Sequence, residues 1–501
     1  MFIKNKMNQI KNHFWLSWFF ILTIVFLINC LTLTVSPPIW QDEVQIIEYG
    51  RIFLHPTTDW SVNWDLLNER PFFTLFYLGC VLQEWAFKAA NSSIAGSRVF
   101  TLIGAGVAAT TTMGYLLYRQ VPRKIAALLG LALLLDPLLV QSYRGDRLDC
   151  WVIAVCLGVC WLLRIAIKNF SEYQLCFITV GLSGSLSVVA MFIWPSAVIL
   201  YPLILLELSS LLYIHFKKQA NFQNSLKLLF VFGFSGIITV ILLLIPIQDQ
   251  LPILISNFIT FSSNLKSNLE LATIINFLQS IKNSPILPIL TVLSLIYYQD
   301  IALILTSLLA LLIILKSSVY IHRVIYILPY LIALLSGIYS QSKYNNNIKT
   351  VRVIFLLLLL SYATSLSLII RPIVGLGNAS GRNIDTLLDS GKNSIGKGEY
   401  KVWDSTYHFY QAGRSLGWKL YHPFRGLEDE KAREKFLDQL DYIITSESPN
   451  NPLYPLIDNS KFKLKETMKM NNQENKGFIY KITKSLKSQS NYGPYNLYSR
   501  F

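Results

Sequence analysis

Long apolar blocks separated by short polar breaks run from near the start of the chain to residue 371. Blocks such as 14–35 and 226–246 approach the roughly 20 residues that a helix needs to cross a bilayer. Hydropathy and charge together place eleven crossings, at 14–35, 98–118, 124–142, 148–167, 174–193, 195–215, 226–246, 285–298, 300–315, 322–340 and 350–371. The pattern therefore predicts an all-α polytopic membrane protein with about 11 transmembrane helices.

The pattern changes after residue 371, where charged runs and turn signals such as Ser448-Pro449-Asn450 replace the apolar blocks. Short β-type stretches appear at 442–445 and 478–482. We expect a small α/β domain of roughly 130 residues in this tail. The predicted organisation is thus a transmembrane module over residues 1–371 and a soluble extracytoplasmic domain over residues 372–501.

The segment 72–88 is apolar but short, and it carries Gln83, Glu84 and Lys88 near its end. Counting it as a crossing would invert every later loop and place the basic cluster at 119–124 outside. We therefore expect an amphipathic helix that lies at the outer membrane interface.

The composition of the 501-residue chain agrees with a membrane protein. Hydrophobic residues make up 53% of the chain and charged residues 15%, whereas typical soluble domains carry about 25% charged residues. The six cysteines all lie in or beside apolar segments and lack metal-type CxxC spacing. These values exclude a soluble globular enzyme, a disordered chain and a secreted disulfide scaffold.

The net charge of +15 comes from lysines and arginines scattered through short loops and the tail, with no basic stretch interleaved with aromatic residues. It indicates contact with anionic membrane lipids and no nucleic acid partner. The basic clusters that fall on one side of the membrane are Lys4/Lys6/Lys11, Arg119/Arg123/Lys124, Arg164/Lys168, Lys217/Lys218 and Lys343/Lys349/Arg352. We therefore expect a protein of the cell's inner (plasma) membrane with a cytoplasmic N-terminus, an uncleaved first helix and the tail outside.

Four charged sites converge on the outer face under this topology. In chain order they are Asp42-Glu43 after the first crossing, Glu69-Arg70-Pro71 at the interfacial helix, Arg144-Gly-Asp146-Arg147-Leu-Asp149 at the fourth crossing and His322-Arg323 at the tenth. Each also has a plainer explanation as a solvated loop, a self-neutralising helix cap or a headgroup anchor. Their convergence from four distant stretches favours a reaction centre.

Such a centre suits group transfer from a lipid phosphate. Departure of a phosphate leaves negative charge that guanidinium groups or a metal must neutralise. An attacking hydroxyl needs a carboxylate base nearby. The surrounding apolar helices would admit a polyprenyl tail.

Short motifs in this order resemble the membrane glycosyltransferases of the dolichyl-phosphate-mannose protein mannosyltransferase type, family 39 and its bacterial relatives, including the lipid A aminoarabinose transferases. These share the GT-C architecture. The resemblance covers roughly residues 35–200, with a weaker echo at 316–337. Its motifs are Pro38-Ile-Trp-Gln-Asp42-Glu43, Glu69-Arg70-Pro71-Phe72, Gly96-Ser97-Arg98-Val99, Arg147-Leu148-Asp149 and Tyr326-Ile-Leu-Pro329.

The resemblance implies that Asp42 is the catalytic carboxylate of an inverting transfer, with Glu43 as the residue that would otherwise take this role. It also implies that Glu69 shapes the site or binds a divalent metal and that Asp149 pairs with Arg70. The donor would be a sugar on a polyprenyl phosphate, and the acceptor a hydroxyl of a lipid, a glycan or a protein at the outer face.

The candidate contacts to the donor phosphate are Arg70, Arg147 and Arg323. Arg70 stands where the family has lysine, which keeps the charge but offers a bidentate fork in place of a point charge, and Phe72 replaces a proline. These departures leave the donor sugar open. A divalent cation bridging Glu69 and His322 is a further prediction, because carboxylate and imidazole ligands with open positions can form a catalytic metal site.

Two other functions compete with transfer. A transporter or flippase of a lipid-linked substrate should carry charges or broken helices near the middle of the bilayer, where Glu207 is the main charged residue. A binding domain on a passive anchor would not need eleven crossings. The sequence therefore favours a polyprenyl-phosphate-dependent glycosyltransferase, with a transporter as the alternative.

Overall fold

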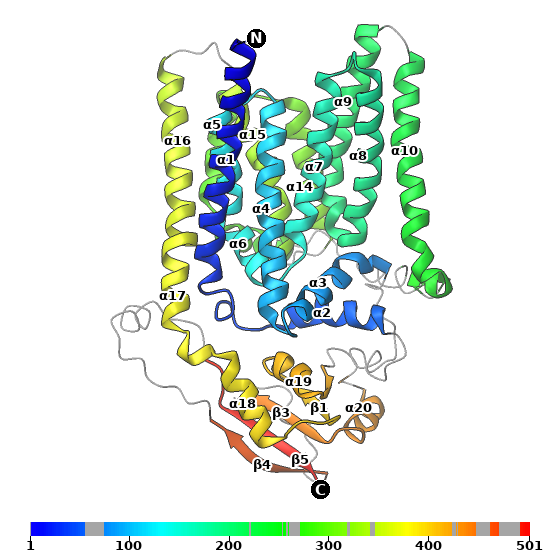
Figure 1. The fold of residues 1–501 in the computed structure, drawn as a ribbon, viewed down its shortest axis with the longest axis vertical. Coiled ribbons are helices and arrows are strands. Elements are labelled where there is room, and N and C mark those ends of the chain that lie inside the picture. Colours follow the sequence, from blue (N-terminus) through cyan, green and yellow to red (C-terminus); the bar gives the residue numbers. More distant parts are fainter. Residues whose placement is uncertain are drawn as a thin grey trace.

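The protein consists of an upright helical bundle, two helices that lie across one end of it, and a small α/β domain beyond them (Figure 1). The N-terminus lies at the opposite end of the bundle from the α/β domain (Figure 1). This arrangement confirms the predicted fold class. The computed structural model describes residues 2–55, 75–219, 222–252, 254–256, 259, 271–317, 321–340, 346–422, 427, 429–446, 461–469 and 491–501.

The helical elements of this part of the chain cover each of the eleven predicted crossings, and one of them, at 271–281, lies between two crossings. They are α1 (Phe2–Cys30), α4 (Ile94–Tyr118), α5 (Arg123–Leu134), α6 (Pro137–Arg144), α7 (Asp149–Lys168), α8 (Tyr173–Ile193), η3 (Pro195–Leu200), α9 (Tyr201–Gln219), α10 (Phe222–Leu244), η4 (Ile245–Gln250), α12 (Leu271–Ile281), α13 (Ile286–Ser294), α14 (Ile301–Lys316), η5 (Ile321–Ile327), α15 (Leu328–Ser340), α16 (Asn346–Thr364), η6 (Ser365–Ile370) and α17 (Arg371–Gly377).

Eight helical spans in the described part of the chain are long and apolar enough to cross a membrane, and the bent pair α5–α6 brings the number to nine. The remaining two predicted crossings are α13, with 9 residues, and α14, with 16. Both fall short of the roughly 20 residues of a full crossing. By length alone, nine of the eleven predicted crossings therefore qualify within the described chain, and α13 and α14 are shorter apolar helices at the other two.

The break between α5 and α6 has a local cause. Asp136 caps α6 by accepting a hydrogen bond from the Leu138 amide at 2.9 Å, and Pro137 occupies the first turn of the new helix. Proline disfavours helical backbone in the residue before it. The two helices consequently meet at 55°, and α6 turns toward the end of the bundle that faces the α/β domain (Figure 1).

Helices α2 (Gln41–Leu54) and α3 (Tyr77–Ala89) lie across the bundle end, between it and the α/β domain (Figure 1). Helix α3 confirms the predicted interfacial helix, although residues 72–74 lie outside the described chain. Helix α2 was not expected from the sequence. It crosses α3 so closely that a Cβ on Gly50 would lie 2.0 Å from the carbonyl oxygen of Cys80, so this position requires glycine.

The C-terminal domain is a five-stranded sheet with helices packed against it. Its elements are η7 (Ser380–Arg382), α18 (Ile384–Ser394), β1 (Lys401–Asp404), α19 (Tyr410–Leu416), β2 (Lys419–Tyr421), α20 (Glu430–Leu437), β3 (Tyr442–Ser446), β4 (Phe462–Met468) and β5 (Tyr495–Arg500). The strand order is β2-β1-β3-β5-β4, with β1 parallel to β2 and β3 and with β5 antiparallel to its neighbours. The strand predicted at 442–445 is confirmed as β3, and the one at 478–482 lies outside the described residues.

Glu207 lies inside the bundle and is fully buried. It accepts a hydrogen bond from the Tyr115 hydroxyl at 2.7 Å and forms ion pairs with Arg119 and Arg164. Arg119 also pairs with Asp300 at 2.9 Å. These contacts tie α4, α7, α9 and α14 together, which gives this intramembrane carboxylate a structural explanation.

Candidate active site

Asp42 and Glu43 stand side by side in the first turn of α2 but have opposite surroundings. Successive residues of an α-helix point about 100° apart. The Asp42 side chain is 37% exposed, whereas Glu43 is completely buried. Of the two predicted catalytic carboxylates, Asp42 is therefore the one that a substrate can reach.

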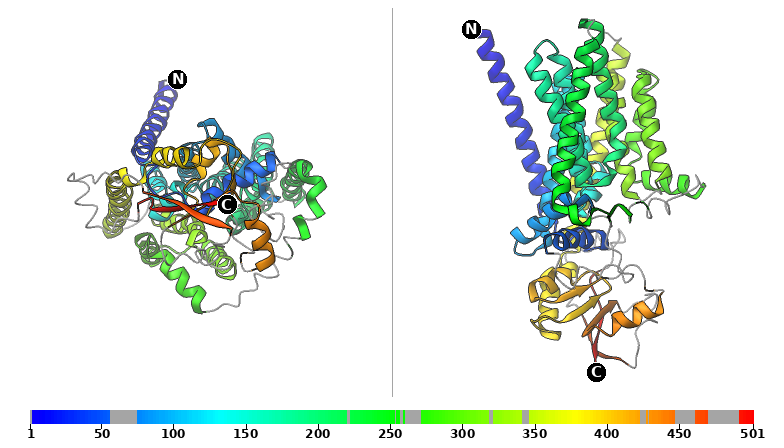
Figure 2. Two further views of the ribbon diagram at one scale, coloured as in Figure 1. Left: turned by 90° about the horizontal axis from the view of Figure 1, so that it is seen from below. Right: turned by 90° about the vertical axis from the view of Figure 1, so that its right-hand side faces the viewer.

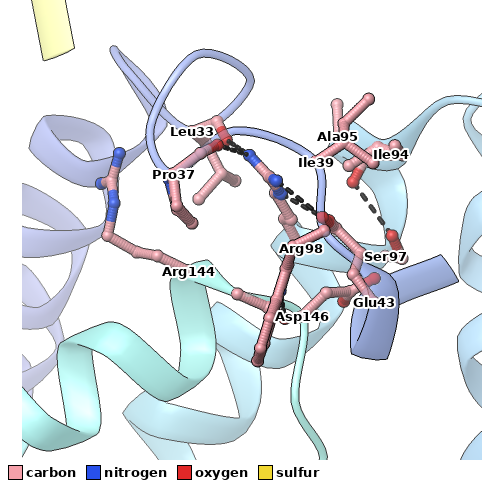
Figure 3. Close-up of polar contacts among 12 residues, drawn as sticks. Leu33, Pro37, Ile39, Glu43, Ile94, Ala95, Ser97, Arg98, Arg144 and Asp146 are labelled. Carbon is pink, nitrogen blue, oxygen red and sulfur yellow. Dashed lines mark hydrogen bonds and ion pairs between the residues drawn. The ribbon is translucent and has the colours of Figure 1, made fainter. Parts of the chain in front are cut away.

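Glu43 forms a bidentate pair with Arg98, the N-terminal arginine of α4. Nε and Nη2 of Arg98 donate to the two carboxylate oxygens at 2.6 and 2.7 Å. Nη1 of Arg98 donates to the carbonyl oxygens of Leu33 and Pro37 (Figure 3). Burial raises the pKa of Glu43, and Arg98 opposes that shift. The pair fixes α2 to α4 and to the segment after α1.

Arg144 performs a related task at the end of α6. Its guanidinium donates to the carbonyl oxygens of Asn29, Thr32 and Ser36 at 2.8–3.2 Å. Carbonyl groups at the end of a helix have no partner within it. Arg144 therefore caps α1 and is placed next to the candidate site without facing substrate.

Arg147 joins two carboxylates of the site. Its Nη1 atom lies 2.5 Å from Oδ2 of Asp42 and its Nε atom lies 2.8 Å from Oδ2 of Asp149. The Arg147 side chain is only 10% exposed. Two negative charges surround this one positive charge, so the group carries a net negative charge.

Asp149, the first residue of α7, accepts two further hydrogen bonds. Its Oδ2 accepts a hydrogen bond from Ser142 at 3.1 Å, and its Oδ1 accepts one from the Tyr326 hydroxyl at 2.7 Å. Tyr326 is fully buried in η5. A continuous polar chain thus runs from Tyr326 through Asp149 and Arg147 to Asp42.

Asp146 lies in the same loop but points away from this chain of contacts. Its backbone adopts φ +60°, and the Gln83 amide of α3 donates to its carbonyl oxygen at 3.1 Å and also to its carboxylate. Burial raises the pKa of Asp146 well above its usual range, and the nearby Glu43 adds to the shift. The two contacts with Gln83 lock α3 to this loop.

Arg323 lies in the same short helix as Tyr326, three residues earlier. In a 3₁₀-helix the side chains at i and i+3 are aligned. Arg323 therefore shares a face of η5 with Tyr326, which reaches Asp149. The predicted residues Glu69 and Arg70 and the side chain of His322 lie outside the described residues, so the pairing of Arg70 with Asp149 stays a prediction.

Within the described residues, no group of three or more His, Cys, Asp or Glu side chains could hold a metal ion. The predicted bridge between Glu69 and His322 involves side chains outside that part of the chain. The described residues alone therefore form no metal centre.

The C-terminal domain reaches the site from the other side. The turn between β1 and α19 carries Tyr407, whose backbone adopts φ +65°. Burial raises the pKa of Tyr407, and the negative charges of Asp404 and Asp42 raise it further. The Ile39 amide donates to the hydroxyl of Tyr492 at 3.1 Å. The segment leading into α2 is therefore in contact with the soluble domain.

Comparison with known proteins shows the class of fold. No family model matches the sequence, and no curated protein is a significant match. The predicted GT-C fold is confirmed by similarity to solved structures. ArnT from Cupriavidus metallidurans bound to undecaprenyl phosphate has a TM-score of 0.59 at 11% identity, over 97% of each chain.

Two further structures agree with this fold. ArnT from Cupriavidus metallidurans in the apo state has a TM-score of 0.55 at 11% identity, over 89% of this chain and 96% of that chain. The archaeal oligosaccharyltransferase AglB from Archaeoglobus fulgidus, in complex with an inhibitory peptide and a dolichol-phosphate, has a TM-score of 0.50 at 12% identity. This match covers 87% of this chain and 70% of that chain.

The structure brings the predicted site residues Asp42, Arg147 and Asp149 into contact. Two of the partners that hold this site were not predicted from the sequence. These partners are Arg98 and Tyr326, which occur in the sequence motifs but for which the sequence predicts no contact. The pairing of Arg98 with Glu43 spans 55 residues and that of Tyr326 with Asp149 spans 177. Helix α2 could have been predicted from the sequence, because Val44 and Ile47 are apolar at helical spacing. Both side chains are buried in the structure.

Proposed function

We propose that the protein transfers a sugar from a polyprenyl phosphate to an acceptor hydroxyl at the outer face of the membrane. The observation that carries this proposal is the position of Asp42: a half-exposed carboxylate held by a buried polar chain at the bundle end that faces the soluble domain. The likeness in fold to ArnT, bound to undecaprenyl phosphate, and AglB, bound to a dolichol-phosphate, supports the class of donor.

Asp42 is the general base of this reaction. Arg147 occupies Oδ2, and no side chain in the described part of the chain contacts Oδ1 by a hydrogen bond. The acceptor oxygen attacks the anomeric carbon on the face opposite the phosphate, and its proton passes to Asp42. The bond between that carbon and the phosphate oxygen breaks, with the electron pair going to the phosphate. This single displacement inverts the configuration.

The predicted phosphate contacts Arg147 and Arg323 lie in the described chain, whereas Arg70 lies outside it. Arg147 is already neutralised by two carboxylates, so we assign it to holding Asp42 in place. We assign the departing phosphate to Arg323, because it shares a face of η5 with Tyr326, whose hydroxyl contacts Asp149. Arg70 remains a candidate from the sequence.

Glu43 is assigned a positioning role in place of a catalytic one. Its carboxylate is buried and both oxygens are engaged by Arg98. A base must come within about 2.6–3.2 Å of the proton it accepts, and Glu43 cannot do so while Arg98 covers it. Glu69 and Asp149 stay site-shaping residues in this proposal.

The charged residues of the site do not determine which acceptor or which sugar the protein uses. Lipid, glycan and protein hydroxyls are all compatible with a base at the membrane surface, and both hexosyl and pentosyl donors fit the reaction. The positive-inside pattern supports a plasma-membrane location with the soluble domain outside.

The test is a transfer assay on the purified full chain with a radiolabelled sugar on polyprenyl phosphate and mixed cell-envelope acceptors. Asp42→Asn is expected to reduce turnover by on the order of 10³-fold or more. The matched control is Asp385→Asn, an exposed carboxylate in the first turn of α18, which should transfer at the wild-type rate. Wild-type turnover in the Asp42→Asn protein would contradict the assignment.

A further inference from the structure

Helix α19 of the soluble domain lies directly against α2 and α3 (Figure 1). The hydroxyl of Tyr410 donates to Oε1 of Glu48 on α2 at 2.6 Å. Arg414, one turn further along α19, lies 3.2 Å from Glu48 and 2.8 Å from Glu84 on α3. We call these four side chains the α19 contact.

The α19 contact is buried, and both of its carboxylates are paired. Glu48 is 2% exposed and Glu84 is fully buried, so neither carboxylate can be there only for solubility. Besides Arg414, Arg51 of α2 pairs with Glu48 and Lys88 of α3 lies 3.4 Å from Glu84. Burial acts to lower the pKa of Arg414, yet Tyr410, Glu48 and Glu84 together raise it, so Arg414 is held charged.

The packing around these charges is aromatic. The guanidinium of Arg414 stacks over the Phe87 ring at 5.0 Å, and the Tyr410 ring lies 5.6 Å from the same ring. Next to them, Gln411 accepts a hydrogen bond from the Ile94 amide, which is the start of α4. A desolvated site makes each of these polar contacts stronger than it would be at a surface.

Helix α2, which α19 contacts through Glu48, also carries Asp42. Glu48 follows Asp42 by six residues on α2, or about 9 Å along the helix axis. Just before the start of α2, the Ile39 amide donates to the hydroxyl of Tyr492 in the soluble domain at 3.1 Å. The soluble domain therefore contacts the chain just before α2, next to Asp42, and contacts the middle of α2 at Glu48.

We propose that the α19 contact positions α2, with Tyr410 and Arg414 acting as positioning residues that orient Asp42 toward its substrate. On this view the soluble domain completes the active site and is not an independent module. The inference rests on the proposed function of Asp42. Neither residue touches substrate, and both act through Glu48, Glu84 and the helix between them.

The first measurement is hydrogen–deuterium exchange of the full chain in lipid nanodiscs. Arg414→Gln is expected to speed exchange of the amides of α2 by at least about tenfold, since Glu48 in the middle of the helix loses its ion pair with α19. The matched control is Arg433→Gln, an arginine of α20 that donates to the Leu427 carbonyl oxygen within its own domain. It should leave α2 exchange unchanged.

The second measurement separates positioning from binding. Loss of alignment should lower kcat by on the order of 10²-fold in Arg414→Gln, while KM for the polyprenyl donor stays within about twofold. Arg414→Lys should recover part of kcat, because lysine keeps the charge but cannot span two carboxylates. If Arg414→Gln does not fold, Tyr410→Phe carries the test, since it removes one hydroxyl and keeps the ring on Phe87.

Each outcome decides the inference. Unchanged α2 exchange in both α19 variants would overturn it, and so would faster exchange with wild-type kcat. A loss confined to KM would also overturn it, because it would make Arg414 a binding contact. If the wild-type protein transfers no sugar at all, the proposed function fails, while the exchange data still report whether α19 holds α2.

Discussion

The hydroxyl of Tyr326 lies 2.7 Å from Oδ1 of Asp149, and this contact joins η5 to the start of α7 across 177 residues of sequence. Through Asp149 and Arg147 it reaches Asp42. A residue with no substrate contact is thereby connected to the proposed base.

We expect Tyr326→Phe to lower transfer by about tenfold, because Arg147 and Asp42 lose a fixed neighbour and small misalignments are costly. The control is Tyr330→Phe on α15, which removes an equally buried hydroxyl that donates to Ile199 at 2.7 Å. Both variants should lose about 1 kcal/mol of stability. An equal loss of transfer in both would show that activity follows stability alone.

Glu43→Gln should destabilise the fold by about 3 kcal/mol or more, because it leaves Arg98 buried without a counter-charge. Asp42→Asn should lower stability much less, since Asp42 is half-exposed and Arg147 still pairs with Asp149. Thermal unfolding in detergent measures both. The exposed Asp389→Asn on α18 serves as the control, and equal melting temperatures for Glu43→Gln and this control would contradict the buried pair.

Stability of the soluble domain should fall with acidification through His408. Burial lowers the pKa of His408 to about 4, with Asp404 opposing the shift, against about 6.5 in an unfolded chain. The unfolded chain therefore binds more protons between these values, and stability present above pH 6.5 is lost as pH falls toward 4. The slope is at most about 1.4 kcal/mol per pH unit.

Exchange protection of β1 and β5 amides from pH 7.5 to 4.5 tests this dependence in the full chain. His408→Gln should flatten it. His55→Gln, which changes an exposed histidine, should behave as the wild type does. A wild-type pH dependence in His408→Gln would assign the effect to other groups.

The predicted metal bridge between Glu69 and His322 is tested by exhaustive chelation, with and without His322→Ala. If the bridge exists, chelation should lower wild-type transfer sharply and have no further effect on the alanine variant. Readdition of Mg²⁺, Mn²⁺ or Zn²⁺ one at a time would identify the ion. Full activity in chelator together with an unaffected alanine variant would leave arginines as the source of positive charge.

The predicted orientation is tested by labelling from outside with an impermeant thiol reagent. Asn393 on α18 and Lys217 on α9 are exposed, and these two helices end at opposite ends of the molecule. Each residue is replaced by cysteine in turn, as Asn393→Cys and Lys217→Cys. The former should react and the latter should not. Native cysteines in the described chain are buried apart from the partly buried Cys30, which keeps the background low. The reverse pattern would place the proposed site on the cytoplasmic side.

The sequence predicted the helices of the bundle because a crossing needs a long apolar stretch and few other structures do. It also brought Asp42, Arg147 and Asp149 to one face, since helix ends on the same side must meet there. It could not separate Asp42 from Glu43, because both are acidic and adjacent. Only the distant Arg98 decides which of them is buried, and nothing local in the sequence encodes that pairing.

Arg144 holds the end of α1 near the site, while only 17% of the apolar window of α1 is buried in the bundle. The helix leans away from the bundle toward its N-terminus (Figure 2). A spanning helix meets a thicker or thinner bilayer by changing its tilt. We therefore expect α1 to pivot about its anchored end, so that differences in lipid chain length are absorbed by this helix before they reach Asp42.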